Sequence, residues 1–258
     1  MDGHISTAEA KARGLPGSDV YLFSHLIYHD ELNRASGVVH LCREALKAFK
    51  DSITLGERYA IEAELLEEQR WLARGGFAKE EIPECPHKNK MMNSINLENF
   101  KIAAGFELVT KSILIEQNII VQEIDSKNAL LNELSKSQKD KPVLIDELLK
   151  IEEYRFNGQL NYIPGLRKKS LNFDTIINKP HYRAVLKIPE NELNLINEFR
   201  KLRNQIHFPT DVMETPLQAA YPKPIVEFFQ DFINTWIIER ANLLTQKYGL
   251  YYNLEPPL

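Results

Sequence analysis

Residues 96–118, "NLENFKIAAGFELVTKSILIEQN", are the stretch of this 258-residue chain that decides its fold. Large apolar residues recur here at helical spacing and form one continuous face: Ile102, Phe106, Val109 and Ile113. Such a helix is stabilised mainly by burying its apolar face against other elements. The stretch therefore predicts a long helix that belongs to a bundle.

The same periodicity extends over most of the chain, and strand-like alternation is nearly absent. The last predicted helix carries six large apolar residues, which is typical of a bundle core: Ile225, Phe228, Phe229, Phe232, Trp236 and Ile237. We expect further helices in residues 17–50 (two helices), 54–76, near 126–137, 141–155 and 190–207, and an irregular segment in 156–189. The predicted fold class is all-α.

The best candidate for a domain boundary is residues 75–95, where Gly, Pro and Lys interrupt the helical period. The predicted helix before it begins with a capping-box pattern at Thr54 and Glu57 and ends at two glycines. We therefore expect an N-terminal helical region in residues 1–90, with no function assigned, and a helical bundle in residues 91–258.

Composition limits the compartments and partners that we expect. Lys and Arg number 32 against 36 Asp and Glu, so no global charge attracts nucleic acid or an anionic membrane. The first residues lack the apolar core of a signal peptide, and no apolar run reaches the length of a membrane span. Cys42 and Cys85 lie far apart, which suits a reducing cytosol. We expect a cytoplasmic protein without a membrane partner.

The segment "FRKLRNQIHFP", residues 199–209, is the first candidate site. On a helix, Arg200, Arg203 and His207 share a face that borders the predicted buried stripe. An Arg fork binds phosphate, and an imidazole exchanges a proton near neutral pH. RNA cleavage without a metal needs these two functions. The alternative is a helix end whose basic residues balance the helix dipole and cap its carbonyls.

Glu107 and Lys111 form the second candidate, an i,i+4 pair in the order that supports a helix. Alone, this pair is an ordinary surface ion pair. The helix "GFELVTKSIL" and the later "LRNQIH" together resemble the HEPN superfamily of helical bundles, which carries a Glu-x-x-x-Lys helix and an Arg-polar motif ending in His. The resemblance covers roughly residues 92–247, and the matching residues are Glu107, Lys111, Arg203, Asn204 and His207.

The resemblance implies a metal-independent endoribonuclease of toxin or defence type, which needs no cofactor and acts as a homodimer with two Arg/His motifs across one cleft. His207 would act as general base or acid, and Glu107, Lys111 and Asn204 would position the reacting groups. Either Arg203 or Arg200 would hold the phosphate, because the family usually spaces arginine and histidine more widely than Arg203 and His207. Other family members are non-catalytic modules, so binding of RNA or of a protein partner, such as an antitoxin, is the alternative.

A basic stretch in residues 155–187 favours RNA as the partner. Aromatic residues are interleaved with seven cations against a lone Asp174: Arg155, Arg167, Lys168, Lys169, Lys179, Arg183 and Lys187. Cations for phosphates and aromatic rings for bases are the components of a single-strand groove. We expect RNA contacts at Arg167, Lys168, Lys169 and Arg183. The alternative is a solvated loop that balances acidic helices elsewhere.

No metal site is predicted. His25 and His29 share a helical face, but Leu26 stands where the zinc-protease pattern needs a glutamate. Cys85 and His87 would need distant ligands to hold a metal.

Overall fold

The structure, a computed structural model, describes residues 28, 30–50, 86–127, 129–151, 166–205 and 225–250, with the backbone alone for 86–98, 168, 202, 204, 205 and 225–227. The predicted helix at 54–76 lies outside these residues, as do His25, His29 and Cys85. The principal helices are α3 (Glu31–Lys50), α5 (Pro86–Glu116), α10 (Glu190–Gln205), α11 (Ile225–Ile233) and α12 (Arg240–Tyr248).

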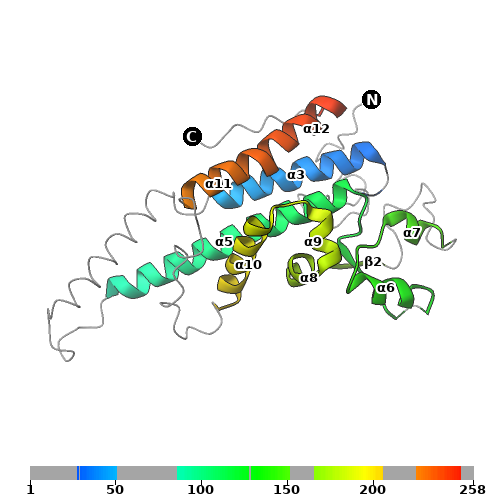
Figure 1. The fold of residues 1–258 in the computed structure, drawn as a ribbon, viewed down its shortest axis with the longest axis horizontal. Coiled ribbons are helices and arrows are strands. Elements are labelled where there is room, and N and C mark those ends of the chain that lie inside the picture. The colour runs from blue at the N-terminus through cyan, green and yellow to red at the C-terminus, as the bar shows by residue number, and fades with distance from the viewer. Residues whose placement is uncertain are drawn as a thin grey trace, which may run out of the picture.

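Helix α5 is the central element of the described fold. It packs against α3 on one side and against α10 on the other, and α12 lies along α3 (Figure 1). The predicted apolar face is confirmed, because Ile102, Phe106, Val109 and Ile113 are all buried. The helix starts at Pro86, ten residues before the predicted stretch, and proline suits the first turn because it lacks an N–H group.

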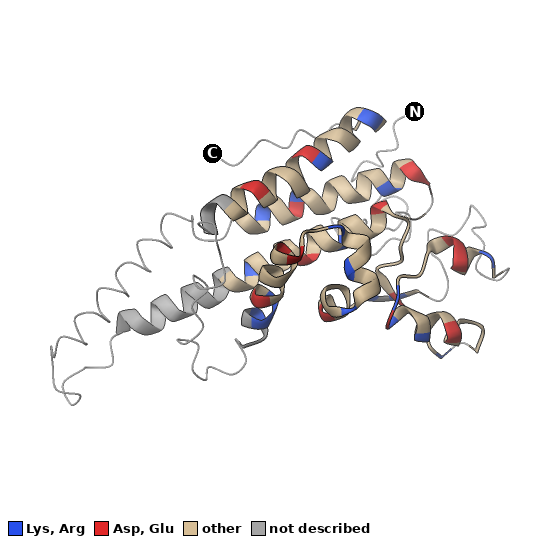
Figure 2. Cartoon of the chain, viewed as in Figure 1, with Lys and Arg blue, Asp and Glu red and all other residues tan. Residues whose placement is uncertain are grey.

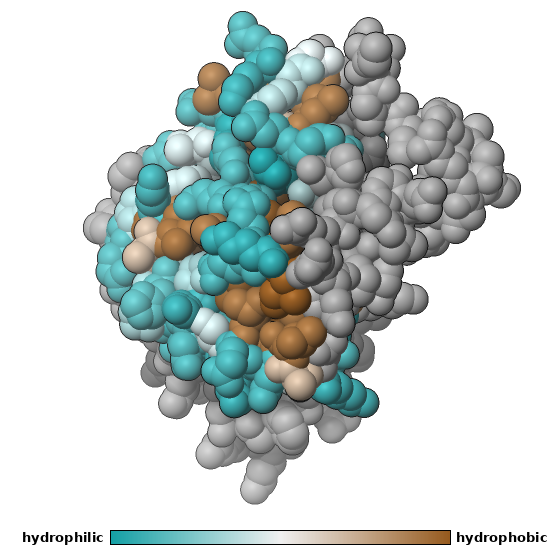
Figure 3. Space-filling view, turned by 90° about the vertical axis from the view of Figure 1, so that its right-hand side faces the viewer, coloured by the Kyte–Doolittle hydropathy of each residue, from teal (hydrophilic) through white to brown (hydrophobic). Residues whose placement is uncertain are grey.

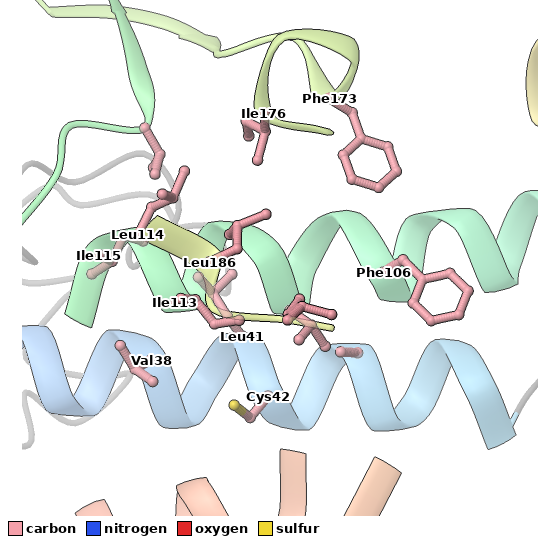
Figure 4. Close-up of a cluster of buried hydrophobic side chains, with 14 of the residues drawn as sticks. Val38, Leu41, Cys42, Phe106, Ile113, Leu114, Ile115, Phe173, Ile176 and Leu186 are labelled. Carbon is pink, nitrogen blue, oxygen red and sulfur yellow. The ribbon is translucent and has the colours of Figure 1, made fainter. Parts of the chain in front are cut away.

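An aromatic cluster around Phe106 joins the main helices. The Phe106 ring centroid lies 5.2 Å from that of Phe49 on α3, 5.7 Å from that of Phe199 on α10, and 5.0 Å from that of Phe232 on α11. Gly105 permits this approach, because a Cβ atom there would lie 2.8 Å from the Phe49 ring. The buried core continues along α3 and α5, and Phe173 and Ile176 point toward α5 from a further helix, α8 (Phe173–Asn178) (Figure 4).

The C-terminal helix contains a π-helical turn, η6 (Asn234–Glu239), between α11 and α12. Four of the six residues expected in its core are described and buried: Phe228, Phe229, Phe232 and Ile237. Trp236 is only partly buried, and its Nε1 donates to Glu192 Oε2 on α10 at 3.2 Å. The indole therefore lies at the edge of the core, where its N–H group finds a partner.

The chain between α5 and α10 forms a smaller layer, which we call the inserted layer. Two strands, β1 (Gln122–Ile124) and β2 (Leu166–Ser170), pair antiparallel with Gln122 opposite Ser170. The layer also holds the 3-10 turn η2 (Ala129–Leu131) and four short helices: α6 (Asn132–Gln138), α7 (Ile145–Leu149), α8 and α9 (Pro180–Leu186).

The predominantly helical class is confirmed, and the inserted layer differs from the predictions in two ways. Residues 166–186 form a strand and two helices in place of an irregular segment, and the helices in the predicted ranges 126–137 and 141–155 are shorter than expected. The strands were not predicted, because three and five residues are too few to establish an alternating pattern.

A buried polar network fixes β1 to its surroundings. The Tyr28 hydroxyl donates to Gln122 Oε1 and accepts from the backbone N–H of Val121 at 2.9 Å. Gln138 on α6 accepts from the N–H of Ile124 and donates to the carbonyl of Gln122. The two side chains thus form hydrogen bonds with backbone groups of Val121, Gln122 and Ile124. Buried backbone N–H and C=O groups require such partners.

Apolar side chains reach the surface at the end of the molecule that carries α6 and α7 (Figure 3). Leu130 and Leu144 are the exposed large residues of this region. Within the described residues, we find no helix that combines the length and the apolar character of a membrane span.

Candidate functional site

Helix α10 brings Arg203 to the centre of α5. The buried residues Leu195, Ile196 and Phe199 hold α10 in the core, and Arg203 lies one turn beyond Phe199. Its Nη1 atom is 2.6 Å from Oε2 of Glu107. Arg203 of the "LRNQIH" segment therefore contacts Glu107 of the "GFELVTKSIL" helix.

Glu107 is shared between two cations. Its other oxygen, Oε1, lies 2.5 Å from Nζ of Lys111, one turn along α5. Lys111 also donates to Oγ of Ser170, at the end of β2, at 2.8 Å. The Lys111 side chain is only 7% exposed, so its ammonium group depends on these partners. Two positive charges against one leave this cluster with an excess of one positive charge.

The electrostatics of Glu107 follow from this arrangement. Burial alone would raise the pKa of its carboxyl group, but Lys111 and Arg203 outweigh burial and hold this pKa below its usual range. Glu107 is therefore ionised at neutral pH and is an acceptor for both cations. Its role is to hold Arg203 and Lys111, since an ionised carboxylate with such partners is a poor proton donor.

Arg200 takes a different direction from Arg203. Its Nη1 atom lies 2.7 Å from Oδ1 of Asp174 on α8, and its Nε atom donates to Asn197 within α10. The side chain is 14% exposed. Of the two arginines, Arg203 thus contacts Glu107, and Arg200 connects α10 to α8.

The remaining residues of the Arg/His motif lie at or beyond the end of α10. Asn204 is part of the helix, with its backbone described. His207 lies outside the described residues, two positions after Gln205, the last residue of α10.

Two neighbours of the cluster were missing from the sequence prediction. Ser170 is the last residue of the basic strand β2, and nothing in its sequence context indicates a contact with Lys111. Phe100 precedes Glu107 by seven residues, which places it on the same face of α5. The guanidinium carbon of Arg203 lies 5.6 Å from the centroid of the Phe100 ring, within cation–π range. This spacing from Glu107 is the signal that could have identified Phe100.

The basic stretch of the inserted layer is balanced by carboxylates. Four of the five cations whose side chains are described in residues 155–187 have an acidic partner: Arg167 with Asp125 at 2.9 Å, Lys169 with Glu123 at 2.8 Å, Lys179 with Asp140 at 2.6 Å and Arg183 with Glu190 at 2.5 Å. Figure 2 shows basic and acidic residues interspersed on these elements. Asp174 is the one acidic residue of the stretch in sequence, but in the fold carboxylates from outside the stretch pair with its cations. The stretch therefore offers RNA less unopposed positive charge than expected. For Lys168, only the backbone is described.

No group of His, Cys, Asp and Glu side chains in the described part of the chain could hold a metal ion. Comparisons with protein-family models, with curated proteins and with solved structures found no match for this chain.

Proposed function

We propose that this chain is a metal-independent endoribonuclease of the HEPN kind, which acts in the cytoplasm as a homodimer. The observation that supports the proposal is the contact between Arg203 and Glu107, since it joins the two short motifs on which the family resemblance rests. A chance pair of motifs has no reason to meet across two helices. The contact also favours Arg203 over Arg200 as the phosphate-binding arginine of the proposal.

The chemistry needs a base, an acid and a cation. His207 removes the proton from the 2′-hydroxyl, and the 2′-oxygen attacks the adjacent phosphorus. The bond from phosphorus to the 5′-oxygen breaks, and an imidazolium, that of the second motif in the dimer, donates a proton to this leaving oxygen. Arg203 stabilises the negative charge that grows on the phosphoryl oxygens. The products are a 2′,3′-cyclic phosphate and a 5′-hydroxyl end.

The cluster suits this task because it orients Arg203 without using its whole donor set. Among the described residues, Glu107 accepts from Nη1 and no group accepts from Nε or Nη2, so this second edge can bind a phosphate. The excess positive charge of the Lys111, Glu107 and Arg203 cluster attracts an anion. Lys111 fixes Glu107, so the guanidinium is held in place before substrate binds.

RNA digestion in EDTA tests the proposal. We expect the wild type to cleave an unstructured RNA and to leave cyclic-phosphate ends. His207→Ala should abolish cleavage, and Arg203→Lys should slow it about 100-fold, because lysine lacks the planar fork. Arg200→Lys is the matched control, since the ammonium can still pair with Asp174, and it should retain most of the activity.

The alternative is a non-catalytic module that binds RNA, and one observation favours it: both arginines already have carboxylate partners. It predicts RNA binding that depends on Arg203 and no cleavage by any variant. Absence of both binding and cleavage by the dimer would contradict either form of the proposal.

A further inference from the structure

We infer that Phe100 stacks on an unpaired base of the RNA next to the phosphate that Arg203 holds, so that the substrate of this site is single-stranded. The inference rests on the proposed function, and it names the substrate class and a residue that positions the substrate.

The first argument is the exposure of Phe100. The residue is 45% exposed on a helix whose other phenylalanine, Phe106, is fully buried. Among the exposed large hydrophobic residues of the described part of the chain, it is the aromatic one, and the others are Leu130, Leu144 and Leu243. A scattered leucine on a surface needs no explanation, but an aromatic ring beside a cationic cluster has the chemistry of a base-stacking platform.

The second argument is the position of the ring. Phe100, Ala104, Glu107 and Lys111 follow one another along one face of α5 at helical spacing. Ala104, between the ring and the carboxylate, contributes only a methyl group. Arg203 reaches this face from α10 and contacts both Glu107 and the Phe100 ring. One guanidinium thus joins the anion-attracting cluster to the aromatic platform.

The third argument concerns what such a pair can bind. A nucleotide carries its base and its phosphate a few ångströms apart, and here a ring for the base adjoins a cation for the phosphate. The ring has two faces, and Arg203 lies over one of them. A base that is paired inside an A-form helix is covered by its neighbours on both faces, whereas an unpaired base is free to stack on a protein ring. The geometry therefore selects single-stranded RNA.

Binding experiments with the His207→Ala variant test this inference without cleavage. We expect it to bind a short single-stranded RNA at least about tenfold more tightly than the same sequence in a duplex. The additional change Phe100→Leu should weaken binding of the single strand about tenfold, while Phe100→Trp should restore it. Leu243→Ala changes an exposed apolar residue elsewhere, on α12, and should leave the affinity unchanged.

A second measurement separates stacking from an indirect effect through Arg203. RNAs with one abasic nucleotide at successive positions should reveal a position where the loss of the base weakens binding about as much as Phe100→Leu does. At that position the two changes should not add, because both remove the same contact. A 2-aminopurine placed there should lose fluorescence on binding to the Phe100 protein and keep it with the Leu variant.

The outcomes distinguish the two proposals. If RNA is bound and cleaved but Phe100→Leu and the abasic RNAs act independently, the stacking inference is wrong and the proposed function stands. Equal affinity for single strand and duplex would also overturn the inference. If the wild type neither binds nor cleaves RNA, both proposals fail.

Discussion

Glu107 and Arg203 are 96 residues apart in the chain, and their carboxylate and guanidinium groups lie 2.6 Å apart in the fold. Lys111 completes the cluster from the other side of the carboxylate. The pairing makes Glu107 a structural residue as well as a candidate site residue. Its substitution should therefore change stability even in the absence of RNA.

Glu107→Gln should destabilise the protein by about 3 kcal/mol, because it leaves the buried ammonium of Lys111 without its counter-charge. Urea unfolding followed by circular dichroism measures this change. Glu133→Gln is the matched control, since Glu133 pairs with Lys136 on the surface and is 85% exposed. The control should cost less than about 0.5 kcal/mol. Equal effects of the two substitutions would show that the Glu107 cluster stabilises the fold no more than a surface ion pair does.

The stability that Glu107 provides should depend on pH. Lys111 and Arg203 lower its pKa in the folded state below 4.5, the ordinary value of a glutamate side chain. A lowered folded-state pKa means that the contribution is complete above about pH 4.5 and is lost as pH falls through the folded-state value. The difference in unfolding free energy between the wild type and Glu107→Gln should thus be constant from pH 7 to pH 5 and shrink in more acidic buffer. A difference that grows on acidification would contradict the lowered pKa.

Gly105→Ala should destabilise the protein by about 1–2 kcal/mol, although alanine favours helices over glycine by about 1 kcal/mol. The added Cβ atom would lie 2.8–3.0 Å from three atoms of the Phe49 ring, which is itself packed among other rings. The effect should be smaller in a Phe49→Leu background, where the ring is absent. Stabilisation of the otherwise unchanged protein by Gly105→Ala would mean that the ring moves away without cost.

Tyr28→Phe should cost more stability than Tyr182→Phe. The first change removes two buried hydrogen bonds, from the N–H of Val121 to the Tyr28 hydroxyl and from this hydroxyl to Oε1 of Gln122. The second removes one, from the Tyr182 hydroxyl to the carbonyl of Gln138. We expect losses of about 2–3 and about 1 kcal/mol, respectively, in urea unfolding. The reverse order would show that the Tyr28 hydroxyl is not a structural connector of β1.

The helices that carry the candidate site could be predicted from sequence because their patterns are long. The apolar face of α5 extends over about three turns, and α10 begins after Pro189. The inserted layer was less predictable, since its strands are short and its helices span five to seven residues. Two local signals were nevertheless available in residues 166–186: Asn172, whose side chain caps α8, and Pro180 at the first turn of α9.

The site itself was predictable only as a set of candidate residues. Sequence spacing identifies Glu107 and Lys111 as neighbours on one helix, but it contains no information on what another helix brings to them. Arg200 and Arg203 were equivalent candidates, and only the packing of α10 sends one to Asp174 and the other to Glu107. The charge balance of the basic stretch could not be predicted for the same reason, because its acidic partners, such as Asp125 and Glu190, lie outside it in sequence.

The π turn η6 has a consequence for how the C-terminal helix tolerates changes in length. A π turn holds more residues than an α-helical turn, so it rotates the residues after Glu239 about the helix axis relative to those before Asn234. Phe232 thereby faces the aromatic cluster while Arg240 meets Ser112 and Glu116 on α5. Deletion of one exposed residue within the turn, such as Thr235, would cancel this rotation and convert the segment to a regular α-helix. An insertion in α11 or α12 would instead rotate one half of the helix away from its neighbours, because these segments are regular α-helix.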